Sequence, residues 1–182
     1  MKLYIFRHGQ TDGNVRNIVQ GAGIDLPLNE TGKAQAENLK ASLAKENLPV
    51  IYCSKMQRAQ NTAQIVASSN GAAVIPIDGL EEVHFGEAEG MLSADAHVKY
   101  ADIFAIIHDP DNPLRNDIGI PGSETVRQST ERGIKALEHI RDNCRFDKAG
   151  VASHGALMFN LYKHYFGEEH RFENCEYFIL DI

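Results

Sequence analysis

Short apolar runs alternate along the chain with longer stretches in which apolar residues recur every three or four positions. Five runs predict strands: Leu3–Phe6, Val50–Cys53, Val74–Ile77, Ala149–Ser153 and Tyr177–Ile182. The first is apolar at every position, which is typical of a strand buried on both faces of a sheet. Pro76 lacks an N–H and cannot complete a ladder, so the third strand is expected at an edge.

The stretches with helical spacing have recognisable starts. Asn29 is suited to cap a first helix, and Ser54-Lys55-Met56-Gln57 fits a capping box for a second. Ser123 is a candidate cap for a third helix, and a fourth is expected to begin just after Gly155. Strands that alternate with helices predict an α/β fold with a mostly parallel central sheet.

The segment 86–122 interrupts this alternation. It contains Pro110, Pro113 and Pro121, and its apolar pattern predicts some helix only around Ala94–Ile107. We therefore expect a single domain over residues 1–182 with a small inserted cap at about 86–122.

Charge and composition narrow the function. The chain has 182 residues and a formal net charge of −7, from 18 Lys and Arg against 25 Asp and Glu. This balance argues against nucleic acids and anionic membranes as partners, because their binding needs basic surfaces. The three cysteines form no CxxC pattern, and the first apolar run is too short for a signal peptide. We expect a cytoplasmic protein without structural disulfides, and monomer and homodimer both stay open.

Chemically active residues follow three of the predicted strands. Arg7-His8-Gly9 follows the first, Ser54 with Arg58 follows the second, and Ser153-His154-Gly155 follows the fourth. Ligands of open α/β sheets bind beyond the carboxyl ends of the strands, so these residues are predicted to gather in one site.

The residue types in this predicted site suit phosphate chemistry. Arginine forks match phosphate oxygens, and Gly155 at a helix start would let backbone N–H groups face an anion. A histidine surrounded by these cations stays neutral and nucleophilic near pH 7, so His8 can attack phosphorus while His154 steadies the transferring oxygens. A leaving alkoxide also needs a proton, and Glu81 and Glu82 both follow the third strand as candidate acids.

Several motifs extend this pattern along nearly the whole chain. They are Arg7-His8-Gly9-Gln10-Thr11 with Asn14, Gln20-Gly21, Asp25–Gly32, Gln35-Ala36, Ser54–Ala63, Leu80–Gly90, Pro121–Thr125 and Ser153-His154-Gly155. In this order they resemble the histidine phosphatase superfamily, the phosphoglycerate-mutase-like group, and within it the phosphatase branch.

The resemblance implies roles for individual residues. It implies His8 as the phosphate-accepting nucleophile, a phosphate pocket of Arg7, Arg58 and His154, Asn14 lining that pocket, and Glu82 as the proton donor. It also implies a three-layer α/β/α fold and activity without a metal ion or cofactor. The alternative for Asn14 is a cap on the turn that follows it, but its fixed spacing from His8 favours the pocket role.

The chain departs from the family pattern in one place. Gly86-Glu87-Ala88-Glu89-Gly90 stands where family phosphatases often carry Gly-x-Trp-x-Gly, and the sequence contains no Trp. This departure removes an aromatic wall near the mouth of the site, so the identity of the substrate does not follow from the resemblance. It does not affect the phosphate pocket.

Three functions fit these observations. The first is a phosphomonoesterase acting on a small phosphorylated metabolite. The alternative is a mutase that returns the phosphoryl group to a second hydroxyl, although only about 30 residues separate Gly90 from Pro121 to form a closed lid. The third is a non-catalytic module that binds phosphorylated proteins, which the presence of a nucleophile and an acid makes less attractive.

Overall fold

The computed structural model describes residues 1–182. The strands are β1 (Lys2–Arg7), β2 (Val50–Cys53), β3 (Ala73–Pro76), β4 (Lys148–Ser153) and β5 (Tyr177–Asp181). The α-helices are α1 (Asp12–Val15), α2 (Glu30–Leu43), α3 (Gln57–Ala67), α4 (Ser93–Lys99), α5 (Ala101–His108), α6 (Val126–Asn143) and α7 (Gly155–Phe166). Two 3₁₀ turns, η1 (Ala44–Glu46) and η2 (Gly86–Ala88), complete the elements.

The strands form one sheet in the order β3-β2-β4-β1-β5. The first four are parallel, and β5 lies antiparallel at one edge. The strand that contains Pro76 forms the other edge, as predicted. Phe6 of β1 and Cys53 of β2 both pair with Ala152 of β4, so the three central strands end at the same level. The residues that follow these strands therefore emerge side by side.

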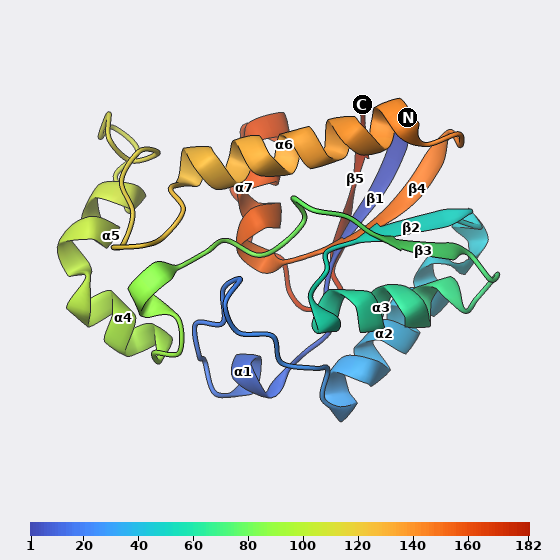
Figure 1. Ribbon diagram of the computed structural model, residues 1–182, viewed down its shortest axis with the longest axis horizontal. Coiled ribbons are helices and arrows are strands. Elements are labelled where there is room, and N and C mark those ends of the chain that lie inside the picture. Colours follow the sequence, from blue (N-terminus) through green and yellow to red (C-terminus); the bar gives the residue numbers. More distant parts are fainter.

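Helices cover both faces of the sheet, and the predicted three-layer α/β/α fold is confirmed (Figure 1). Leu3 and Ile5 of β1 belong to the core shared with α6 and α7, whereas Tyr4 and Phe6 belong to the core shared with α2 and α3. This alternation explains why every position of the strand is apolar.

The helix starts differ partly from the prediction. Asn29 caps α2 by accepting from the N–H of Gly32. Ser54 does not cap α3, whose N-cap is Met56, because the Ser54 hydroxyl bonds the N–H of Met56 and the ring of His154. Ser123 does not cap α6 either, where Thr125 forms a capping box with Gln128.

Residues 86–122 contain two short helices, α4 and α5, within the stretch where the sequence predicts some helix. The two helices meet at Tyr100, whose backbone is not helical and which is buried in one cluster with Ala88, Ala96 and Ile120. The two ends of the insertion meet at Gly86, where an added Cβ would lie 2.3 Å from the carbonyl oxygen of Pro121.

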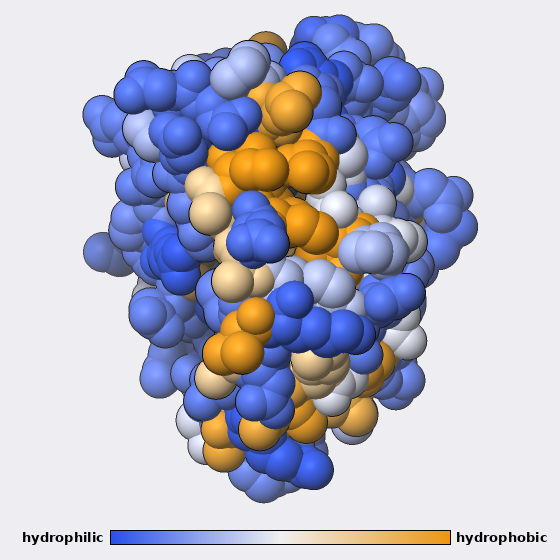
Figure 2. Space-filling view, turned by 90° about the vertical axis from the view of Figure 1, so that its left-hand side faces the viewer, coloured by the Kyte–Doolittle hydropathy of each residue, from blue (hydrophilic) through white to orange (hydrophobic).

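Hydrophobic side chains gather on the face of the molecule that carries the insertion, within a largely hydrophilic surround (Figure 2). Helix α5 has no fully buried residue although it is mostly apolar, and Val98 and Leu114 are exposed by 80% and 55%. None of the helices has the length and apolarity that a membrane crossing requires.

Candidate active site

His8 lies directly beyond β1 and is almost fully enclosed, with 2% of its surface exposed. Its backbone N–H donates to the carbonyl of Ser153 at 3.0 Å, which ties it to the end of β4. Its ring Nδ1 lies 2.7 Å from the carbonyl oxygen of Gly9. Because a carbonyl only accepts, Nδ1 carries the proton, and Nε2 presents a free lone pair.

The loop after His8 is anchored to two helices. The N–H of Gly9 donates to Thr62 Oγ1 on α3 at 3.0 Å, and the N–H of Gln10 donates to Gln35 Oε1 on α2 at 2.9 Å. Gly32 lets the two backbones touch, since a Cβ there would lie 2.1 Å from the carbonyl oxygen of Gln10. Sequence reasoning did not assign these anchors a role. The one local signal is Thr62, a polar residue that lies one turn after Arg58 on the buried face of α3.

Arg58 is buried with 1% of its surface exposed and uses three guanidinium nitrogens. Its Nε donates to Nδ1 of His154 at 3.2 Å, and its two Nη atoms donate to the carbonyls of Ile24 and Gly21 at 2.8 and 2.9 Å. His154 in turn donates from Nε2 to Ser54 Oγ at 2.8 Å. Arg58 and His154 are thus brought together as predicted, and both ring nitrogens of His154 are occupied.

Arg7 reaches the same site from the end of β1. Its Nη1 donates to the carbonyl of Phe172 at 2.7 Å. Its Nε is the one buried side-chain nitrogen or oxygen in the protein without a hydrogen-bond partner. A Cβ on Gly155 would lie 3.1 Å from this Nε, so the glycine lets helix α7 begin close against the guanidinium.

The two histidines are held neutral. Their ring centroids lie 5.1 Å apart. Burial, followed by the positive charges of Arg58 and Arg7, holds the pKa of His8 well below 6.5. Burial and the charge of Arg58 lower the pKa of His154 in the same way. A neutral imidazole with a free Nε2 is the form that can attack phosphorus.

The structure separates the two candidate acids. Glu82 points to the start of α7, where its carboxylate accepts from the N–H groups of Ala156 and Leu157 at 3.1 and 3.0 Å. Glu81 points away, and its carboxylate accepts from the N–H of Gly79 and lies 3.9 Å from Arg132. Of the two carboxylates, Glu82 is therefore the one bonded to the start of α7, directly after His154.

Asn14 lies at the start of α1 beside the site. Its Oδ1 accepts from the N–H and the hydroxyl of Thr11 in a capping box. The side chain thus bonds back to Thr11, the N-cap of α1, and does not cap the turn that follows it. Its amide nitrogen is left with no partner in the protein. A pocket role for Asn14 rests on this nitrogen alone.

A model of the histidine phosphatase superfamily (branch 1) matches residues 3–181. The chain belongs to the histidine phosphatase superfamily. The predicted family and the predicted phosphomonoesterase class are confirmed, since phosphatases recur among the relatives.

Individual relatives of this histidine phosphatase span most of its length. Phosphoglycerate mutase-like protein 4 of Arabidopsis thaliana is 30% identical over 165 residues, which cover 89% of this chain and 70% of the relative. Metal-independent phosphoserine phosphatase, also of Arabidopsis thaliana, is 30% identical over 164 residues, which cover 88% of this chain and 67% of the relative. The solved structure of Bacillus stearothermophilus YhfR superposes with a TM-score of 0.88 at 24% identity, covering 100% of this chain and 91% of that one, and shows the shared fold.

Proposed function

We propose that this protein hydrolyses small phosphate monoesters through a phosphohistidine formed on Nε2 of His8. The observation that carries the proposal is the pairing of two unused groups in one enclosed site. His8 has a free Nε2 because Nδ1 is bonded to Gly9, and Arg7 has a buried Nε without a partner. An unpaired buried cation donor beside a neutral nucleophile is the arrangement that a bound phosphate would complete.

The reaction then proceeds in two displacements. Nε2 of His8 forms a bond to phosphorus while the ester P–O bond breaks, and Glu82 gives a proton to the departing alkoxide. In the second displacement, water attacks phosphorus and gives a proton to Glu82. The P–N bond to His8 breaks, and inorganic phosphate is released. Proton donation and acceptance by one carboxyl restores the enzyme without any further reactant.

The arginines stabilise the transferring oxygens. The Nε–H of Arg7 is free to bind one oxygen, and each Nη atom of Arg58 has a second hydrogen beyond the one given to a carbonyl. From the start of α7 the N–H of Gly155 is left for the phosphate, since Glu82 takes the N–H groups of Ala156 and Leu157. Together these donors place positive charge where the phosphoryl oxygens carry negative charge in the transition state.

Residues 86–122 are proposed to act as the cap of this single domain and to choose the leaving group. Ala88 stands where family phosphatases often carry Trp, and it is buried within the insertion against Tyr100 and Ile120. The phosphoserine phosphatase among the relatives acts on a small alkyl phosphate, as its name says. A small phosphorylated metabolite with an alkyl leaving group is the substrate class that we assign.

The test is phosphate release from a panel of small phosphomonoesters in the presence of EDTA. Wild type, His8→Asn and His139→Asn are compared, because His139 is an exposed histidine on α6 whose ring bonds only Asn143 of the same helix. We expect turnover by wild type and His139→Asn and none by His8→Asn. A radioactive phosphoryl group trapped on wild type by alkaline quench should be absent from His8→Asn.

Other outcomes point elsewhere. Wild-type turnover by His8→Asn overturns the mechanism. Phosphoryl transfer between hydroxyls that is faster than hydrolysis identifies a mutase. Phosphopeptide binding that phosphate competes away, without any turnover, identifies a binding module.

A further inference from the structure

The segment that carries Glu82 lacks regular structure, so something outside it must fix its position. Residues Gly79–His84 follow β3 without forming a helix or a strand. A proton donor must lie within hydrogen-bond reach of the leaving oxygen, which an unsupported loop does not ensure.

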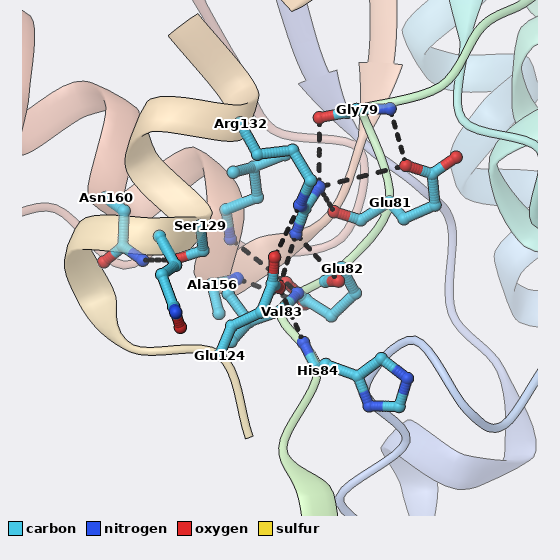
Figure 3. A network of polar contacts seen from close by, with 12 residues as sticks. Gly79, Glu81, Glu82, Val83, His84, Glu124, Ser129, Arg132, Ala156 and Asn160 are labelled. Carbon is cyan, nitrogen blue, oxygen red and sulfur yellow. Dashed lines mark hydrogen bonds and ion pairs between the residues drawn. The ribbon is translucent and has the colours of Figure 1, made fainter. Parts of the chain in front are cut away.

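Arg132, on helix α6, holds this segment by its carbonyls. Its Nη1 donates to the carbonyl oxygens of Gly79 and Glu81, both at 3.0 Å, and its Nη2 donates to that of Glu82 at 3.3 Å (Figure 3). One guanidinium therefore contacts three carbonyls within four consecutive residues. With two further bonds to Glu124, the guanidinium uses all five of its N–H donors, whereas an ammonium group has only three.

Glu124 completes the support from the start of α6. Its two carboxylate oxygens accept from Nε and Nη2 of Arg132, both at 2.7 Å. The same carboxylate accepts from the N–H of His84 at 3.0 Å, and the N–H of Glu124 donates to the carbonyl of His84 at 2.8 Å. The segment is thus held at both ends by one ion pair that is about three-quarters buried, with side-chain exposures of 25% and 23%.

The two ends of Glu82 are fixed by different helices. Arg132 of α6 holds its carbonyl, while the first N–H groups of α7 hold its carboxylate. Arg132 bonds neither His8, Arg58 nor the carboxylate of Glu82, so it has no direct share in the phosphate pocket. Apart from a minor contribution of its charge to the lowered pKa of His154, its effect on the reaction passes through the position of the acid.

We infer that Arg132 and Glu124 are positioning residues that hold Glu82 for protonation of the leaving group. This inference rests on the proposed function. It predicts that loss of the ion pair lowers kcat most for substrates whose leaving group most needs a proton.

Phenyl phosphate and p-nitrophenyl phosphate separate this effect from general damage. The two esters have similar size, but nitrophenolate leaves readily as an anion whereas phenolate, with a conjugate acid of pKa about 10, benefits from protonation. The experiment measures kcat for both in wild type, Arg132→Gln, Glu124→Gln and Arg127→Gln. Arg127 is the matched control, because it lies on the same helix in an exposed pair with Asp117.

We expect Arg132→Gln and Glu124→Gln to lower kcat for phenyl phosphate about tenfold more than for p-nitrophenyl phosphate. This factor is smaller than the whole contribution of a general acid, because Glu82 is displaced but still present. Arg127→Gln should leave both unchanged. In a Glu82→Gln background, Arg132→Gln should no longer change the ratio of the two rates, since the acid through which it acts is gone. Equal losses for both esters, or a change of ratio that persists without Glu82, would overturn the inference.

A readout independent of turnover keeps the inference separable from the proposed function. Amide hydrogen exchange at Ala156 and Leu157 reports whether the Glu82 carboxylate stays on α7. We expect faster exchange there in Arg132→Gln, and in the milder Arg132→Lys should the first variant not fold. Unchanged exchange in a folded variant contradicts the inference, whether or not the wild type hydrolyses either ester. Failure of the wild type to hydrolyse either ester counts against the proposed function alone.

Discussion

Arg58 Nε donates to His154 Nδ1 across 3.2 Å, which joins helix α3 to the end of β4. With Nδ1 accepting, His154 must carry its proton on Nε2, where it donates to Ser54 Oγ. His154 therefore has no free ring N–H, and contact of this ring with a phosphate requires the bond to Ser54 to open. In the described arrangement, His154 acts on the site by orienting Arg58.

Replacing Ser54 by Ala should destabilise the protein measurably. The substitution leaves the buried Nε2–H of His154 and the N–H of Met56 without their acceptor. An unsatisfied buried donor costs about 1–3 kcal/mol, so we expect the free energy of unfolding to fall by at least that amount. Urea unfolding followed by circular dichroism measures it. Ser42→Ala, at an exposed serine of α2, is the control and should change stability by no more than about 0.5 kcal/mol; equal losses for the two variants would contradict the prediction.

Replacing Arg58 by Lys keeps the positive charge but removes the fork. A lysine ammonium cannot reach the carbonyls of Gly21 and Ile24 and the ring of His154 together. We expect kcat/KM to fall about 100-fold, the size seen when one preorganised donor to a developing charge is lost. Steady-state kinetics on the best ester of the panel measures this. Arg127→Lys should behave as wild type, and a wild-type rate for Arg58→Lys would show that charge alone suffices.

Adding a methyl group at Gly32 should disturb the nucleophile from a distance. The new Cβ would lie 2.1 Å from the carbonyl oxygen of Gln10, which is backbone and cannot swing away. Overpacking of this kind costs about 1–3 kcal/mol, and here it displaces the loop that holds His8. We expect Gly32→Ala to lower both stability and kcat.

Gly71→Ala provides the matching control for Gly32→Ala. Gly71 has a positive φ of 72° but open space around its Cβ position. This variant should lose some stability through backbone strain while kcat is unchanged. Equal kcat losses in the two variants would contradict the role of Gly32.

The sequence predicted the parts of this protein that depend on pattern and order. Apolar runs placed all five strands, Pro76 placed the edge, and the strand ends located Arg7, His8, Arg58 and His154 together. These features follow from the period of burial and from the rule that parallel strands end at one edge.

What the sequence did not predict depends on contacts between distant segments. Ser54 has the residue type and spacing of a helix cap, but the ring of His154, a hundred positions later, takes its hydroxyl. Arg132 looks like an ordinary surface residue of an amphipathic helix, and only the fold brings the Glu82 segment beneath it. Local propensity cannot report such long-range bonds.

The buried neutral histidines predict a pH dependence of stability with a definite sign. The pKa values of His8 and His154 in the folded protein lie well below 6.5, the ordinary value that they regain on unfolding. Below pH 6.5 the unfolded chain therefore binds more protons than the folded chain, and the free energy of unfolding must fall as the pH falls. Each group contributes a slope of at most about 1.36 kcal/mol per pH unit, so the two together lower the free energy of unfolding by at most about 2.7 kcal/mol between pH 6 and 5. Urea titrations at several pH values should show this slope, reduced to about half in His8→Asn and unchanged in His139→Asn. A slope near zero in the wild type would mean that both histidines are protonated in the folded state.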